Sequence, residues 1–113
     1  MSARKSLVNP VSIAQPLKPY YANGVMVTPG PLIFISGQVG IDADGHTVAP
    51  DLAGQAIQTL ENIKAILEAH DGSMSDIVKV TVYVTDMCAY HDLTDIRVRD
   101  FGDNPPASTI IHV

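Results

Sequence analysis

Apolar and polar residues follow two different periods in the second half of the chain. Between Asp51 and Gly72 the apolar residues recur every three or four positions, which is the period of an amphipathic helix. Asp51 suits the N-cap of this helix, and the pair Asp71-Gly72 suits its end. From Val78 to Thr85 apolar and polar residues alternate strictly, which predicts a strand with one buried face. The apolar positions of the helix are Ala53, Ala56, Ile57, Leu60, Ile63 and Leu67.

Weaker patterns surround these two elements. Residues 20–27 and 31–36 are short β-prone runs joined by Thr28-Pro29-Gly30, which predicts an antiparallel hairpin. Residues 92–101 predict a second helix, and residues 108–113 predict a final strand. The order β-β-α-β-α-β predicts an α+β fold in which two helices pack on one face of a mixed sheet.

The second face of the predicted sheet has no helix to cover it. In the strand from Val78 to Thr85 this face carries Thr81, Tyr83 and Thr85, which are β-branched or aromatic and uncharged. Such a face can be buried in an oligomer, or it can stay in contact with water in a monomer. The pattern leaves both possibilities open.

Length, charge and cysteine content narrow the class of protein. A chain of 113 residues supports one hydrophobic core, so we expect one domain over residues 1–113, with residues 1–16 as an N-terminal arm. The net charge of −5 offers no basic face, so nucleic acid is not an expected partner. No apolar run is long enough for a transmembrane helix, and the single cysteine cannot form an intrachain disulfide. We expect a cytoplasmic protein.

The sequence contains few groups of residues that could form a catalytic, metal-binding or ligand-binding site. Its four histidines and one cysteine lack metal-binding spacing, and no nucleotide loop or catalytic triad motif occurs, so we expect neither a metal nor a cofactor. Ser36-Gly37-Gln38 follows a predicted strand, where glycine lets the backbone approach a ligand. Tyr20 could place a phenol at the edge of a cleft. A plain turn and ordinary packing explain these features equally well.

Four segments together resemble one family. They are Lys18-Pro19-Tyr20, residues 34–38, residues 59–63 and residues 78–84. Through them the chain is similar over about residues 17–113 to the RidA family, also called the YjgF or L-PSP endoribonuclease family. The resemblance implies a chorismate-mutase-like fold in which three copies form a trimeric barrel, with small-molecule clefts between subunits. It also implies hydrolysis of reactive 2-imino or 2-enamino acids without a cofactor.

The resemblance assigns the cleft residue by residue. Tyr20 matches the family's cleft tyrosine and is the candidate catalytic residue. Ser36, Gly37 and Ile110 match positions that line the pocket, and Thr94 stands near a family asparagine. Ser108 occupies the position at which the deaminases carry an arginine that grips the substrate carboxylate.

The substitution at position 108 changes the expected activity. Without that arginine, deamination of small 2-imino acids should be slow, unless Arg97, Arg99 or a lysine of a neighbouring subunit supplies the contact. Family members also continue beyond the equivalent of Val113 into a strand with a water-orienting glutamate, so we expect either an incomplete C-terminus or a protein without that strand.

Three functions fit these observations. The first is an imine or enamine hydrolase with an altered substrate, and the second is a non-catalytic trimeric protein that binds a small molecule. The third is ribonuclease activity, which has the least support because the chain is acidic.

Overall fold

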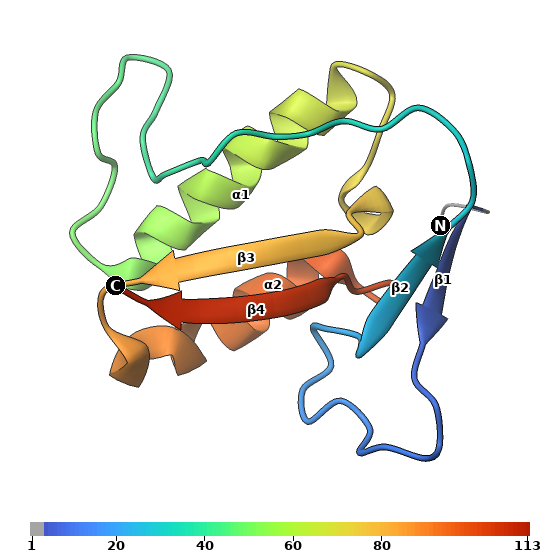
Figure 1. The fold of residues 1–113 in the computed structure, drawn as a ribbon. Coiled ribbons are helices and arrows are strands. Elements are labelled where there is room, and N and C mark those ends of the chain that lie inside the picture. The colour runs from blue at the N-terminus through green and yellow to red at the C-terminus, as the bar shows by residue number, and fades with distance from the viewer. Residues whose placement is uncertain (1–3) are drawn as a thin grey trace.

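The computed structural model describes residues 4–113, so the first three residues of the expected arm lie outside it. The described residues form two helices, four strands and two short 3₁₀ helices (Figure 1). The bounds in chain order are β1 Lys5–Val8, β2 Gly24–Val27, α1 Leu52–Glu68, η1 Met74–Asp76, β3 Lys79–Val84, η2 Met87–Leu93, α2 Thr94–Phe101 and β4 Ala107–His112.

Helix α1 is the element that the sequence predicts best. The Asp51 carboxylate accepts a 3.3 Å hydrogen bond from the backbone N–H of Gly54, which confirms Asp51 as the N-cap. Leu67 on the apolar face of the helix forms a buried cluster with Met74 and Phe101, and Leu60 and Ile63 of the same face pack against it. This cluster is the core between the two helices and the strands.

Strands β3 and β4 form a parallel pair, and both helices lie on one face of it (Figure 1). Val80 pairs with Ser108 and packs against the core cluster, so the even-numbered residues of β3 point toward the helices. Thr81 and Tyr83 point away from the helices, and Tyr83 is 63% exposed. The open face predicted from the alternation is therefore present.

The predicted hairpin of residues 20–27 and 31–36 is wrong. β2 pairs antiparallel with β1, with Leu7 opposite Val25, and residues 31–36 form no strand. The side chain of Arg4 donates hydrogen bonds to the carbonyls of Thr28 and Pro31, which holds the turn beside β1. The described residues consequently form two separate two-stranded sheets, one antiparallel and one parallel, instead of the single mixed sheet that we expected.

The chain from Pro31 to Gly40 runs in extended form along α1 (Figure 1). Ile35 packs on the core cluster, and the Asn62 amide of α1 donates to the carbonyls of Val39 and Ile41. Before Ile35 the segment leaves apolar side chains in solvent, with Phe34 91% exposed. Within residues 4–113, no helix is both long and apolar enough to span a bilayer.

A buried lysine ties the N-terminal strand to the rest of the molecule. The Lys5 ammonium donates to the carbonyls of Ser75, Ile77 and Asn104 at 2.9, 2.7 and 2.6 Å. The Asn104 side chain donates in turn to the carbonyl of Ser75 at 3.0 Å. Burial lowers the pKa of Lys5 to about 8, although the nearby Asp76 acts in the opposite direction. This network fixes the loop that leads into β4.

Candidate functional site

The backbone places Tyr20 beside the start of β4. The N–H of Ala22 donates a 2.9 Å hydrogen bond to the carbonyl of Pro106, and Ala22 forms a parallel bridge with Ala107. The segment that carries Tyr20 is thereby held next to the residues that precede Ser108. Tyr20 and Pro106 are both buried, so this junction is firmly packed.

Arg97 joins Tyr20 to Ser108. Its guanidinium carbon lies 4.2 Å from the centroid of the Tyr20 ring, and its Nη2 donates a 2.7 Å hydrogen bond to Ser108 Oγ. The ring of Phe101 lies 5.8 Å from the same carbon. Arg97 is only 4% exposed. A guanidinium therefore stands beside Ser108, but it comes from α2 and not from β4.

Sequence reasoning named Arg97 only as a substitute contact, although a signal for it was present. Leu93, Arg97 and Phe101 are spaced four residues apart and lie on the same face of one helical run, and all three are buried. An arginine in an apolar stripe is unusual, because charged side chains are rarely buried fully without a partner. The place of Arg97 in this apolar stripe is the sequence feature that could have identified it as a candidate site residue.

The site residues shift each other's acidity. Burial raises the pKa of the Tyr20 phenol, and the positive charge of Arg97 opposes that rise. Burial lowers the pKa of Arg97, but a guanidinium keeps its proton at neutral pH. At pH 7 the site therefore holds a neutral phenol, a cation and the hydroxyl of Ser108. The phenol can donate a hydrogen bond or a proton.

The other predicted site residues are only partly brought together. Ile110 lies two residues after Ser108 on β4, so both side chains are on the helix side of the strand. Thr94 begins α2 and is half-buried. Ser36 and Gly37 lie exposed in the extended segment, and no hydrogen bond among the described residues joins them to Tyr20, Arg97 or Ser108.

Two hollows of the surface lie away from this cluster. One hollow of about 590 Å³ is bordered by Ser73, Arg99 and Asp103, and another of about 600 Å³ is bordered by Leu17 and Tyr21. Neither is lined by Tyr20, Arg97 or Ser108. Tyr20 and Arg97 are each 4% exposed and Ser108 is half-buried, so a ligand must displace a side chain to reach Arg97.

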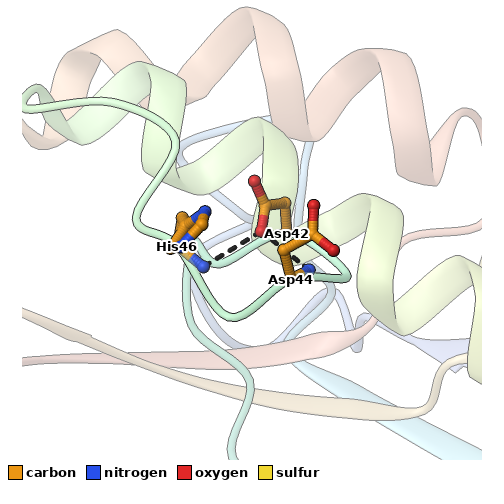
Figure 2. Close-up of side chains that lie close together, drawn as sticks. All are labelled: Asp42, Asp44 and His46. Atoms are coloured by element: carbon orange, nitrogen blue, oxygen red, sulfur yellow. Dashed lines mark hydrogen bonds between the residues drawn. The ribbon is translucent and has the colours of Figure 1, made fainter.

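Asp42, Asp44 and His46 form a second polar group, at a surface turn (Figure 2). Their side-chain ligand atoms lie within 4.8 Å of one another, close enough to hold a cation. However, Asp42 Oδ1 accepts 3.0 Å hydrogen bonds from the backbone N–H groups of Asp44 and His46, and Gly45 adopts a positive φ of 81°. These features are those of a tight Asp-Gly turn, and turn formation alone accounts for the arrangement.

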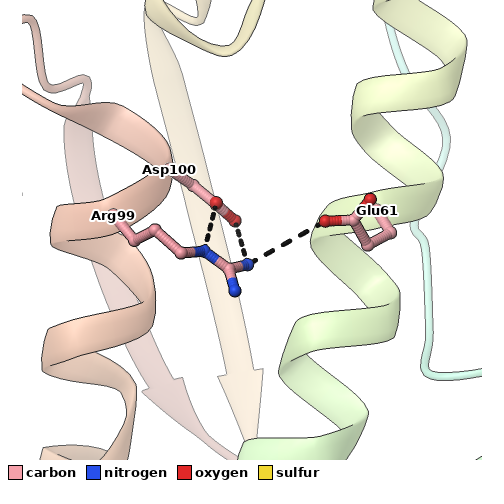
Figure 3. A network of polar contacts seen from close by, with 3 residues as sticks. All are labelled: Glu61, Arg99 and Asp100. Carbon is pink, nitrogen blue, oxygen red and sulfur yellow. Dashed lines mark hydrogen bonds and ion pairs between the residues drawn. The ribbon is translucent and has the colours of Figure 1, made fainter.

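An exposed polar network links the two helices (Figure 3). Arg99 on α2 donates to Asp100 at 2.9 and 3.3 Å and approaches Glu61 of α1 at 3.9 Å. The hydrogen bond and charge of Asp100 raise the pKa of Arg99. Exposed ion pairs of this kind contribute little stability. Arg99 thus has carboxylate partners in solvent, two residues away from the buried Arg97.

Comparison with known proteins identifies the class and then the family. The fold is that of the Rid class: a crystal structure of a Rid-family protein from Yersinia pestis superimposes with a TM-score of 0.90, at 24% identity, over 97% of this chain and 86% of that one. The sequence model of the family described as Endoribonuclease L-PSP matches residues 12–113. The chain belongs to this family, which confirms the resemblance seen in the sequence.

Two curated relatives show the range of the family. A RutC family protein of Pyrococcus horikoshii is 36% identical over 110 residues, which cover 96% of this chain and 85% of the relative. A protein of Salmonella typhimurium named 2-iminobutanoate/2-iminopropanoate deaminase is 45% identical over 67 residues, which cover 59% of this chain and 51% of the relative. The family therefore includes at least one protein named as an imine deaminase.

Proposed function

We propose that the protein hydrolyses an imine or enamine at the cluster formed by Tyr20, Arg97 and Ser108. The observation that carries the proposal is the packing of a protonated tyrosine against a buried guanidinium, beside a serine hydroxyl. The similarity to the Salmonella typhimurium deaminase supports the reaction class. Ribonuclease activity receives no comparable support, because the net charge is −5.

The chemistry requires no metal or organic cofactor. Water adds to the electrophilic carbon of a protonated imine, and the electrons of the C=N π bond move to nitrogen. A proton then moves from oxygen to nitrogen, and ammonia leaves with the electrons of the C–N bond. An oxygen lone pair forms the C=O bond, and the proton that remains on oxygen passes to ammonia. The Tyr20 phenol, whose pKa burial raises above its ordinary value, carries its proton at neutral pH as an unshifted tyrosine also would, so Tyr20 can orient the water or donate to the leaving nitrogen.

The proposal includes a homotrimer with the ligand cleft between subunits. The exposed Tyr83 and Thr81 on the open face of β3, and the exposed Leu32 and Phe34, supply apolar surface that an assembly would bury. Ser36 and Gly37 would then reach the cleft of a neighbouring copy. We also place the protein in the cytoplasm, on the ground that its single cysteine, Cys88, is free.

A non-catalytic binding protein is the second candidate. The lack of a free hydroxyl at the cluster supports it, because Ser108 Oγ accepts a hydrogen bond from the buried Arg97 and Tyr20 is only 4% exposed. A protein of this kind would keep the recognition residues without turning a substrate over.

A coupled assay separates the two candidates. A pyridoxal-phosphate enzyme generates 2-iminobutanoate in the cuvette, and semicarbazide traps whatever imine is not hydrolysed. We expect the protein to lower the rate of semicarbazone formation and Tyr20→Phe to lose most of this effect. Tyr21→Phe is the matched control, because the phenol of this neighbouring tyrosine accepts a hydrogen bond from the N–H of Leu17 and, among residues 4–113, makes none with Arg97 or Ser108. An unchanged trapping rate with the wild-type protein would leave only the binding function.

A further inference from the structure

The charge of Arg97 is buried without a counter-charge. Its side chain is 4% exposed, and within residues 4–113 no carboxylate forms an ion pair with it. Its Nη1 atom is buried and has no hydrogen-bond partner in the part of the chain that the structure describes. Buried guanidinium groups are normally paired, because an unpaired charge in a protein interior is strongly destabilising.

Packing alone does not explain this residue. The guanidinium carbon lies 4.2 Å from the centroid of the Tyr20 ring, and Ser108 Oγ accepts a hydrogen bond from Nη2. A guanidinium has five N–H donors, and these two contacts leave the buried Nη1 without an acceptor among the described residues. By contrast, the exposed Arg99 on the same helix has two carboxylates beside it. The exposed arginine therefore has carboxylate partners, whereas the buried arginine, whose charge is more costly to leave unpaired, has none among the described residues.

We propose that Arg97 is the anion-binding residue of this protein and that it takes the carboxylate of a small-molecule ligand in the plane of its guanidinium. The inference rests on the proposed function only in placing a small molecule at this cluster. Nη1 is free to donate to one carboxylate oxygen. Ser108 can rotate its hydroxyl to donate to the same carboxylate, so that Nη2 is released for a second bond.

The proposal assigns a ligand class. The guanidinium carbon lies 4.2 Å from the centroid of the Tyr20 ring, and a ligand reaches the N–H groups of the guanidinium when a covering side chain moves aside. These N–H groups lie in one plane, which suits a planar carboxylate. The site accordingly selects a small monocarboxylate, such as a 2-imino or 2-oxo acid, over the corresponding amide. Arg97 achieves this from α2, and the loss of an arginine at position 108 therefore does not remove carboxylate recognition.

The test compares two ligands that differ only in charge. Binding of 2-oxobutanoate and of 2-oxobutanamide to the full chain is measured by NMR titration at fixed ionic strength. We expect the wild type to bind the carboxylate at least about tenfold more tightly than the amide, as a charge-assisted bond predicts. Arg97→Met should lose that preference and keep amide binding within about threefold. Arg99→Met, which removes the exposed arginine, should behave as the wild type.

A melting experiment distinguishes binding from a structural role. If Arg97 only holds Tyr20 and Ser108 together, Arg97→Met should lower the melting temperature. We expect the melting temperature of Arg97→Met to be unchanged or higher, because the variant removes an unpaired buried charge. If Arg97→Met fails to fold, the proposal is overturned. Arg97→Lys, which keeps the charge without the planar fork, should show an intermediate carboxylate preference.

The outcomes separate this inference from the proposed reaction. A carboxylate preference that depends on Arg97, without any imine hydrolysis, supports carboxylate binding by Arg97 and contradicts the proposed enzymatic activity. Imine hydrolysis that is unaffected by Arg97→Met contradicts carboxylate binding by Arg97 and supports the enzymatic activity. Equal affinity of the wild type for acid and amide, or binding of neither, overturns the role of Arg97.

Discussion

The Lys5 ammonium donates a 2.6 Å hydrogen bond to the carbonyl of Asn104, which lies 99 positions later in the chain. The same ammonium also binds the carbonyls of Ser75 and Ile77. One side chain near the N-terminus thus satisfies three carbonyls that surround the entry to β4, the strand that carries Ser108. The geometry of the candidate site depends on this distant contact.

Replacing Lys5 should destabilise the fold. In Lys5→Met the carbonyls of Ile77 and Asn104 lose the ammonium donor, while the Ser75 carbonyl keeps the Asn104 amide, and unsatisfied buried acceptors cost about 1–3 kcal/mol. We expect a decrease of that size in the free energy of unfolding measured in urea. Lys64→Met on the exposed side of α1 is the control and should change the free energy by less than about 0.5 kcal/mol. Equal effects of the two variants would show that Lys5 has no special role.

The titration of Lys5 should make a measurable contribution to the pH dependence of the free energy of unfolding. Burial lowers its pKa from 10.5 to about 8, so between these values the unfolded chain holds a proton that the folded chain has released. The contribution of Lys5 to the free energy of unfolding therefore rises as the pH increases from about 8 to 10.5. Because other groups titrate in this range, the quantity to measure is the difference between the wild type and Lys5→Met. A difference that stays constant or shrinks across this range contradicts the assignment.

Truncation within the core cluster should be costly. Leu67 is 7% exposed and packs with Met74 and Phe101, so Leu67→Ala leaves a cavity and should lower the free energy of unfolding by about 2–4 kcal/mol. Ile57→Ala on the same helix provides the comparison, because Ile57 is 39% exposed and should cost about 1 kcal/mol or less. Urea titration of both variants measures the contrast. A smaller loss for Leu67→Ala than for Ile57→Ala would place the core elsewhere.

The proposed trimer predicts a mass and a sensitive position. Light scattering at micromolar concentration should give a mass about three times the 12.1 kDa of one chain. Tyr83→Glu puts a charge on the open face of β3 and should shift the mass toward one chain with unchanged circular dichroism. His70→Glu, after the end of α1, is the control for added charge. A wild-type mass of about 12 kDa would exclude the trimer.

The elements with a strong local period were predictable from the sequence. α1 and β3 each bury one face against a single core, so the spacing of their apolar residues shows which face is buried and which type of element it belongs to. The hairpin was not predictable, because the partner of β2 is β1 in the N-terminal arm, and strand pairing is a non-local choice. Residues 31–36 have the composition of a strand without a partner strand in the described residues.

The candidate site was predictable only in part. Tyr20 and Ser108 were named from the family resemblance, and in the structure both contact Arg97. The spacing of Leu93, Arg97 and Phe101 indicates that Arg97 is buried, but its contacts with Tyr20 and Ser108 depend on how α2 packs over β4. Packing between elements distant in sequence is the information that a one-dimensional pattern lacks.

The extended segment around Phe34 has a consequence for proteolysis. Endoproteases bind their substrates as extended chains, and exposed segments of this kind are the preferred sites of nicking. Phe34 is 91% exposed, and it follows two apolar residues, Leu32 and Ile33, that are also accessible. A free chain should therefore be cut by chymotrypsin at this point before its helices are digested. In an assembly that buries the segment the same bond should resist cleavage, so the rate of cutting at Phe34 reports how much of the protein is unassembled.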